Sequence, residues 1–419
     1  MMKALFAAIA GLQNHITFMD VVGNNIANVN TQGFKASRVT FQDMLTQNIS
    51  GASAPTADRG GTNAMQIGLG MKLGAIDVLQ GQGSLQATGR STDFAIQGNG
   101  FFIVRDGARS FYTRDGAFDV SVTGELVNPT NGFKVQGWRA DAAGTVDTTV
   151  PIGSIAIPYG QSIGAQASGA LTLQGNVDSR VADATMFSTT AEVYDSLGEA
   201  HPVEMQFTKN GANTWDVTLA SSDANVDIAA STVNAADTPV TFDAAGRMTN
   251  PAAGSPLRLS VALIAGAQAT SPVAVNVNVD GVTQFAAAGQ LASTFNDGYS
   301  AGALVSFSVG PGGDITGIFS NGTTRPLGQM AMGLFTNPGG LQRAGSNNFE
   351  ETANSGTPII GTPGTGGRGA IGAGVLEGSN TDLAREFTNV VIAQRGFQAS
   401  SKIISTADQM LEGLVNLTR

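Results

Sequence analysis

The stretch SNTDLAREFTNVVIAQRGFQASSKIISTADQMLEGLVNLTR, residues 379–419, decides how this chain is organised. It begins with an S-x-x-[DE] pattern at residues 379–382, where a hydroxyl and a carboxylate satisfy the free N–H groups of a helix start. After this pattern come no prolines and only Gly396 and Gly413. One apolar column recurs every seven residues: Leu383, Val390, Phe397, Ile404 and Leu411. A strict seven-residue column keeps one side of a helix against a partner, so the sequence predicts a coiled-coil-like helix over residues 379–419.

A second column of this helix, Ala393, Ser400 and Ala407, is made of small residues. Small side chains allow the backbone of a partner helix to approach closely. The helix is therefore predicted to pack tightly against other helices.

The partner is expected at the other end of the chain, as an N-terminal helix over residues 1–32. Its apolar residues alternate in steps of four and three and continue one heptad on: Leu5, Ile9, Leu12, Ile16, Met19 and Ile26. Gly33 is a plausible stop for this helix. The simpler alternative is that both terminal helices pack within one globular domain.

Amides crowd the end of this helix, at Asn24, Asn25, Asn28 and Asn30. Asn24 and Asn28 share one helical face. Two interpretations stay open: buried amides that fix the register of a helix interface, or a solvated helix end.

Composition narrows the class of protein. A chain of 419 residues is expected to hold two to four domains. Only 13% of the residues are charged, and the net charge of −10 argues against a nucleic-acid partner. Cysteine is absent, which excludes disulfides and thiolate sites. No uninterrupted apolar run reaches about 18 residues, so no membrane-spanning helix is expected. The apolar start is too short for an ordinary signal peptide and should remain uncleaved.

Between the helices the sequence changes period. Residues 33–70 are expected to form an extended linker. Hairpin signals such as Asn99-Gly100 and Asp106-Gly107 then predict an inner β domain, with its first part at 71–159 and its second part at 301–378. Residues 160–300 alternate apolar and polar positions and predict an inserted outer β domain of sandwich or barrel type. The predicted fold class is multidomain α+β: terminal α-helices form a coiled-coil-like core, and two mainly antiparallel all-β domains follow in nested order.

Residues for chemistry are scarce. The chain has two histidines, His15 and His201, which fall in different segments without metal-ligand spacing. No G-x-S-x-G nucleophile motif occurs, and carboxylates are scattered. We therefore expect no catalytic, cofactor-binding or metal-binding residues, no required cofactor and no enzyme activity. A hydrolase with paired carboxylates is unsupported rather than excluded.

Two long motifs carry a family resemblance. NNIANVNTQGFK at residues 24–35 and the stretch at 379–411 resemble the terminal signatures of axial proteins of the bacterial flagellum. AIQGNGFFIV at 95–104 is similar to the β domain of flagellar rods and hooks, and AEVYDSLGEAHPVEMQF at 191–207 resembles the outer domain of the flagellar hook protein family. The N-terminal motif assigns family positions to Asn24, Asn25, Asn28, Asn30, Gly33 and Phe34.

The resemblance implies a structural subunit that self-assembles into the flagellar hook, a curved hollow tube that transmits torque from the rod to the filament. It implies an extracellular location and export by the type III apparatus without signal-peptide cleavage. The implied partners are further copies of the chain and the distal rod, hook cap and hook–filament junction proteins, with no nucleic acid and no membrane insertion. Some hook proteins cross-link through a cysteine, which is impossible here.

Two alternatives remain. One is a distal rod subunit, a family that is similar at both ends but is expected to lack a large insert like 160–300. The other is a secreted β-rich binding module or adhesin, which needs no terminal heptad helices.

Overall fold

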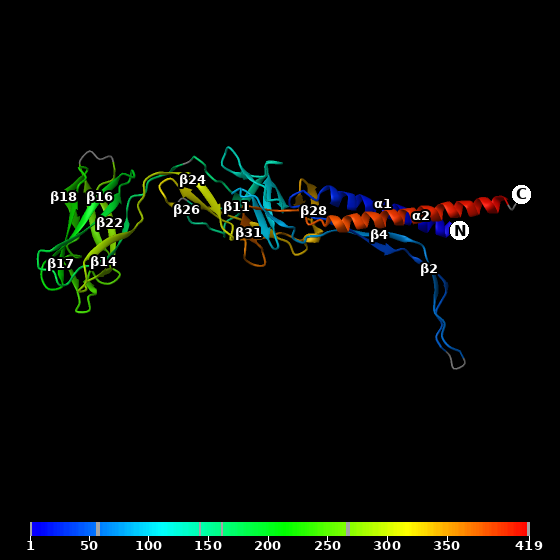
Figure 1. The fold of residues 1–419 in the computed structure, drawn as a ribbon, viewed down its shortest axis with the longest axis horizontal. Helices are drawn as coiled ribbons and strands as arrows, with labels where there is room; N and C mark the ends of the chain where they lie inside the picture. Colours follow the sequence, from blue (N-terminus) through cyan, green and yellow to red (C-terminus); the bar gives the residue numbers. More distant parts are fainter. Residues whose placement is uncertain (1, 56–58, 142–143, 161, 265–268, 417–419) are drawn as a thin grey trace. The chain divides into compact units, whose positions relative to one another are not determined.

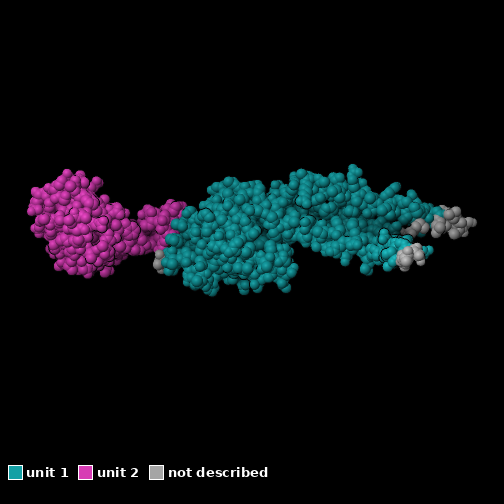
Figure 2. All heavy atoms as spheres, turned by 90° about the horizontal axis from the view of Figure 1, so that it is seen from below, with its two compact units in different colours: residues 1–157, 307–316, 326–419 teal, residues 158–306, 317–325 magenta. Residues whose placement is uncertain are grey.

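The computed structural model describes residues 2–55, 59–141, 144–160, 162–264 and 269–416. The chain divides into two compact units (Figure 2). Unit 1 comprises Met1–Ile157, Phe307–Thr316 and Pro326–Arg419, and unit 2 comprises Pro158–Ser306 and Gly317–Arg325. The predicted fold class is confirmed: two terminal helices pack together, and the segments between them form mainly antiparallel sheets, with β14 and β22 as a parallel pair.

Helix α1 spans Met2–Ala27 and helix α2 spans Leu383–Asn416. Helix α2 starts after Asp382, whose Oδ1 accepts the backbone N–H groups of Ala384 and Arg385 at 3.0 and 3.2 Å. Residues 417–419, which the sequence placed in this helix, lie outside the described residues, as does residue 1.

Helix α1 ends five residues before the predicted boundary at residue 32 because of its amides. The side chain and the backbone N–H of Asn28 both donate to the carbonyl of Asn24, at 2.9 and 3.2 Å. An asparagine side chain that binds a backbone carbonyl competes with the hydrogen bonds of the helix backbone, and this favours a helix end. The chain then turns at Gly33, where φ is +66° and an added Cβ would lie 2.6 Å from the backbone N of Asp115.

Part of α1 also resembles a membrane span. The segment Lys3–Ala27 is long enough to cross a membrane and has a mean hydropathy of 1.3. The sequence analysis did not expect such a segment, because polar residues interrupt its apolar residues. This is weak evidence for a span, because helices that pack against protein pass the same test.

Unit 1 is built of short strands and one 3-10 helix, η1. Their bounds are β1 Ser37–Asp43, β2 Thr46–Ser50, β3 Met65–Gly68, β4 Met71–Val78, β5 Leu85–Ala87, β6 Phe94–Gln97, β7 Phe101–Asp106, β8 Arg109–Thr113, β9 Asp119–Val120, β10 Leu126–Val127, β11 Lys134–Arg139, β12 Gly153–Ser154, β27 Met332–Leu334, η1 Pro338–Gly340, β28 Gln342–Gly345, β29 Asn348–Glu350, β30 Ile359–Gly361, β31 Ala370–Ala373 and β32 Val375–Glu377. Three more strands divide between the units: β24 Gly302–Val309, β25 Asp314–Phe319 and β26 Thr324–Met330.

Aromatic side chains fill the core of the β part of unit 1. Phe335 makes edge-to-face contacts with Phe101 and Tyr112, at centroid distances of 5.9 and 4.7 Å. The Asp106-Gly107 signal produces the predicted turn, since Asp106 on β7 pairs with Arg109 on β8 and Gly107 has a φ of +54°.

The segment predicted as a linker at residues 33–70 forms paired strands instead. Strand β1 pairs with β4, and β2 pairs with β3. We call β2 and β3 the arm, because in Figure 1 they extend away from the helix pair of unit 1. All residues of both strands are exposed, including Ile49 at 59% and Met65 at 58%. The alternating burial that reveals a strand in a sequence is missing there, which is why the pattern did not predict it.

Unit 2 contains two five-stranded sheets, with strand orders β18-β21-β22-β14-β23 and β15-β16-β17-β19-β20. Its strands are β13 Ser162–Ile163, β14 Ala170–Asn176, β15 Met186–Tyr194, β16 Ala200–Lys209, β17 Thr214–Ser221, β18 Val226–Val233, β19 Val240–Phe242, β20 Met248–Asn250, β21 Leu257–Leu263, β22 Val273–Thr283 and β23 Gln290–Asn296. Alternate residues of both sheets, with the fully buried Trp215, form one apolar core. The unit extends beyond the expected insert at 160–300, because residues 301–306 and 317–325 belong to it as well.

Acid should weaken unit 2 through Asp237. Hydrogen bonds from the Arg258 guanidinium, at 2.9 Å to each carboxylate oxygen, hold the pKa of Asp237 below its ordinary value of 3.8. A carboxylate with a lower pKa in the folded state stabilises the fold above its unfolded pKa, and this contribution disappears as the pH falls through the folded value. The stability difference between the unmodified chain and Asp237→Asn, measured by urea unfolding, should therefore shrink below about pH 4. A constant difference from neutral pH to about pH 2 would contradict this assignment.

Candidate assembly surface

The two terminal helices form an antiparallel pair that lies side by side (Figure 1). Three contacts fix the register. A Cβ on Gly11 would lie 3.0 Å from Ser400 Oγ, and a Cβ on Gly396 would lie 2.4 Å from the His15 ring. Near the other end of α1, Asn25 Nδ2 donates to Glu386 Oε1 at 3.3 Å. The two glycines allow the backbones to approach closely.

The seam between the helices consists of small and polar side chains. Its buried members are Ala8, Gly11 and Asn25 on α1, and Glu386, Ala393 and Ala407 on α2. The small column of α2 predicted from the sequence therefore lies at the helix pair. A seam of small residues buries little apolar area, so this contact alone contributes modestly to stability.

The larger apolar residues predicted for helix packing lie beside this seam. On α1, Ile9 and Ile16 are 36% and 40% exposed, and Leu5, Leu12, Met19 and Ile26 are half-buried. On α2, Leu383 and Leu411 are 40% and 38% exposed, and Val390, Phe397 and Ile404 are half-buried. Within one chain the predicted columns are thus only partly covered.

Further exposed apolar side chains on the pair were not predicted. They are Phe6 on α1 and Phe387, Val391, Ile392, Ile403 and Met410 on α2. A groove of about 490 Å³ lies among Ala4, Ala399, Lys402, Ile403, Thr406, Ala407 and Met410. We call this the helix groove. The sequence does contain a pattern on this side of α2, because Ile392, Ala399 and Thr406 form another seven-residue column. The sequence analysis did not recognise it, because the column that begins at Leu383 has larger apolar residues.

The Asn-rich motif forms the joint between α1 and the β part of unit 1. Asn25 is fully buried and binds both backbone groups of Ser37: its Oδ1 accepts the N–H at 2.9 Å and its Nδ2 donates to the carbonyl at 2.8 Å. This amide fixes register, whereas Asn24 and Asn30 are exposed. Phe34 is buried under the guanidinium of Arg343, 5.0 Å from its ring centroid.

Next to this joint lie three buried charges, Lys35, Arg114 and Glu377, which we call the junction cluster. Lys35 Nζ donates to Glu377 Oε1 at 2.6 Å, and both side chains are fully buried. Arg114 Nη1 lies 3.4 Å from Glu377 Oε2, and the Arg114 side chain is 4% exposed. Glu377 Oε1 also accepts the backbone N–H of Gly83 at 2.8 Å.

Burial dominates the electrostatics of the junction cluster. Loss of hydration lowers the pKa of Lys35 and of Arg114, and the Glu377 carboxylate opposes both shifts. One carboxylate thus serves two buried cations. Sequence patterns could not predict this cluster, since Lys35 and Glu377 are 342 positions apart.

The two histidines also lie in different surroundings. His15 packs against α2, as described above. His201 is buried against Asp195 and Asp223 in unit 2, two carboxylate neighbours that the sequence analysis did not predict. The turn between β15 and β16 brings Asp195 close to the ring, and the segment between β17 and β18 brings Asp223 there. A search for H-x-x-x-H spacing does not detect this arrangement.

Comparison with known proteins matches both terminal segments and the β segments at residues 95–299 to families of flagellar axial proteins. The chain matches models of the flagella basal body rod protein at residues 7–35 and the flagellar hook protein FlgE/F/G D1 domain at 95–174. It also matches the flagellar basal body protein FlaE D2 domain at 165–299 and the flagellar basal body rod FlgEFG C-terminal model at 373–417.

Relatives match along the whole length. The chain is 41% identical over 450 residues to the flagellar hook protein FlgE of Borreliella burgdorferi, with 100% of both chains covered. It is 30% identical over 420 residues to the flagellar basal-body rod protein FlgG of Bacillus subtilis, again with 100% of both covered. The crystal structure of Helicobacter pylori flagellar hook protein FlgE2 shares the fold, with a TM-score of 0.52, 14% identity, 68% coverage of this chain and 98% of that one.

Proposed function

This chain belongs to the flagellar hook protein family, and from that membership we propose that the exposed apolar columns of its terminal helices are the surfaces through which its copies polymerise. It is a structural subunit of the extracellular hook of the bacterial flagellum. The hook is the curved tubular joint that transmits torque from the rod to the filament.

The observation that carries the proposal is the incomplete burial of the helix pair. Ile9 and Ile16 on one helix and Ile392, Ile403 and Met410 on the other remain open to water within one chain. Large exposed apolar patches mark surfaces that bind other molecules. In a polymer, the helices of neighbouring copies cover these faces, and the partly buried columns at Leu5 and Leu383 become fully buried.

The arm is a second surface for contact between copies. Leu45 beside it is 84% exposed, and Ile49 and Met65 on its strands are more than half exposed. Two paired strands without other support are marginal in water, so contact with neighbouring subunits is expected to stabilise the arm.

We propose the same route of export and the same assembly partners that the family resemblance implies. The subunit leaves the cell through the type III export apparatus with its N-terminal helix intact, since α1 is needed for packing. It adds to a growing structure that the distal rod begins, that the hook cap covers and that the hook–filament junction proteins complete.

A rod subunit is the second candidate, favoured by the full-length similarity to the rod protein FlgG. The alignment covers 100% of both chains, and the expectation that a rod subunit lacks a large insert like 160–300 stays a prediction. Electron microscopy of the purified chain at high concentration tests the choice. Curved tubes support the hook, straight tubes support the rod, and absence of tubes contradicts assembly through the helix pair.

The terminal helices should order fully only on assembly. Apolar residues such as Leu5 and Ile9 contribute about 1.5–3 kcal/mol each when fully buried, and each ordered residue costs about 1–2 kcal/mol of backbone entropy. The 26 residues of α1 therefore need more burial than the small-residue seam provides. Helical circular dichroism should rise on polymerisation, and protease should trim the monomer to about residues 70–375 while sparing the tubes. A monomer that resists protease and already has its full helix content would contradict this.

A further inference from the structure

A cluster of possible metal ligands lies in unit 2, at the turn between β15 and β16. Asp195, Glu199 and His201 each offer one ligand atom, and the three atoms lie within 4.8 Å of one another. Asp195 and His201 are buried, whereas Glu199 is exposed at the rim. Carboxylate and imidazole groups are ligands that transition-metal cations favour.

The tautomer of His201 is set by Asp223, which lies in the segment between β17 and β18. His201 Nδ1 lies 2.6 Å from Asp223 Oδ2, and Asp223 is held in place because its Oδ1 accepts the backbone N–H of Asn225 at 2.9 Å. An ionised carboxylate only accepts hydrogen bonds, so the Nδ1 atom carries the proton.

This arrangement leaves His201 Nε2 with a free lone pair. The atom is buried without a hydrogen-bond partner, and the side chain is 2% exposed. Asp195 Oδ2, which is another acceptor, lies 3.6 Å from this atom. A carboxylate on one ring nitrogen with the other nitrogen left free is the usual arrangement around a metal-bound histidine.

Asp195 is oriented in advance for the same role. Its Oδ1 accepts the backbone N–H groups of Leu197 and Glu199 at 2.8 and 2.9 Å, which closes the turn and directs Oδ2 toward the imidazole. Ligands at the usual zinc distances on a tetrahedral ion are separated by about 3.3–3.5 Å, close to the gap between Oδ2 and Nε2.

We propose that Asp195, Glu199 and His201 bind one divalent transition-metal cation, with Zn²⁺ as the best match, and that Asp223 positions the imidazole. Glu199 closes the site from the rim, and water completes the coordination. The ion neutralises carboxylate charge and ties the β15–β16 turn to the segment around Asp223. The site is independent of the polymerisation proposed above, because all four residues belong to unit 2.

Zinc titration of the full-length monomer tests the site. With a chromogenic zinc indicator as competitor in metal-free buffer, the unmodified chain should bind one equivalent of Zn²⁺. Glu199→Gln should weaken binding at least about tenfold by loss of a ligand, and Asp223→Asn about 10–100-fold by loss of the positioning carboxylate. X-ray absorption at the zinc edge should show nitrogen and oxygen ligands at about 2.0–2.2 Å.

Matched controls make the result decisive. Asp183→Asn removes one exposed carboxylate from unit 2 outside the cluster, and His15→Gln removes the other histidine; both should bind like the unmodified chain. Unchanged emission of Trp215, in the core of unit 2, establishes that each variant is folded. If the unmodified chain binds no zinc, or if Glu199→Gln and Asp223→Asn bind it equally well, the proposal is wrong and His201 pairs with its carboxylates through protons alone.

Discussion

Ile403→Asp is expected to abolish tube formation while leaving the monomer folded. Ile403 lines the helix groove and is 48% exposed in one chain, so an aspartate there costs the monomer little. In the polymer the same position becomes buried against another copy. The substitution then removes about 1.5–3 kcal/mol of apolar burial and leaves an unpaired charge out of water, and this penalty repeats in every subunit. Sedimentation and electron microscopy at a concentration where the unmodified chain polymerises measure the effect.

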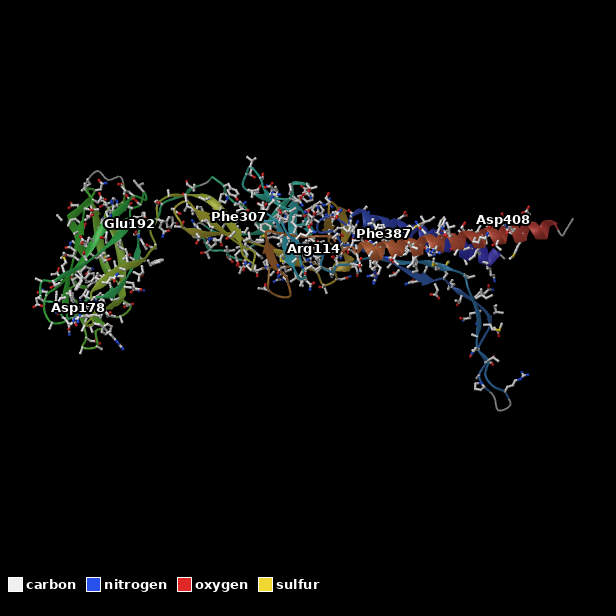
Figure 3. All side chains as sticks on the ribbon, viewed as in Figure 1. Arg114, Asp178, Glu192, Phe307, Phe387 and Asp408 are labelled. Carbon is white, nitrogen blue, oxygen red and sulfur yellow. The ribbon has the colours of Figure 1, made fainter. Side chains whose placement is uncertain are left out.

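Ser401→Asp is the matched control. Ser401 is exposed in another seven-residue column of α2, which already contains the native carboxylate of Asp408 (Figure 3). One added charge in that column should leave assembly intact. If both variants polymerise normally, the helix groove is not a contact between subunits; if both fail, net charge rather than the groove controls assembly.

Glu377→Gln is expected to destabilise unit 1 by about 3–5 kcal/mol, because removing one partner of a buried ion pair leaves its counterpart uncompensated. Here two cations, Lys35 and Arg114, depend on the same carboxylate, and all three side chains are at least 96% buried. Glutamine keeps the shape of the side chain but not its charge. Urea unfolding followed through Trp138, which lies in the core of unit 1, should show the loss in a lowered midpoint.

The comparison is an exposed ion pair in the same unit. Arg109 and Glu350 are joined at 2.7 Å, with side chains 66% and 36% exposed. Because water and salt screen such a pair, Arg109→Gln should leave the midpoint unchanged within error. Equal losses for the two substitutions would mean that burial does not give the junction cluster its importance.

The sequence predicted what depends on local periodicity. Heptads located both helices, and Asp106-Gly107 located the turn between β7 and β8, because neighbouring residues determine these features. For the seam between the helices, the sequence predicted the residues on α2 but not those on α1. The small column at Ala393 and Ala407 was recognised as a close-contact surface, but its counterpart on α1, Ala8 with Gly11, consists of residues with little apolar character.

Features that depend on distant residues were not predictable. The arm has exposed strands, so nothing in its pattern distinguishes it from a loop. The junction cluster and the surroundings of His201 bring together single charged residues from separate segments. A lone lysine or histidine has the same appearance in a sequence whether it is solvated or buried against a carboxylate, and only the fold decides which it is.

The junction cluster also imposes an order in time. Lys35 lies near the start of the chain and its carboxylate partner lies 342 residues later, so the buried cation has no counter-charge until the chain is almost complete. Contacts over such separations form slowly, because closing the intervening loop must be achieved first. Unit 2 has its own core and can fold while unit 1 is still unfinished. A chain delivered from its N-terminus would therefore complete the joint at the base of its helices last, and a subunit truncated before Glu377 would lack the carboxylate that this joint needs.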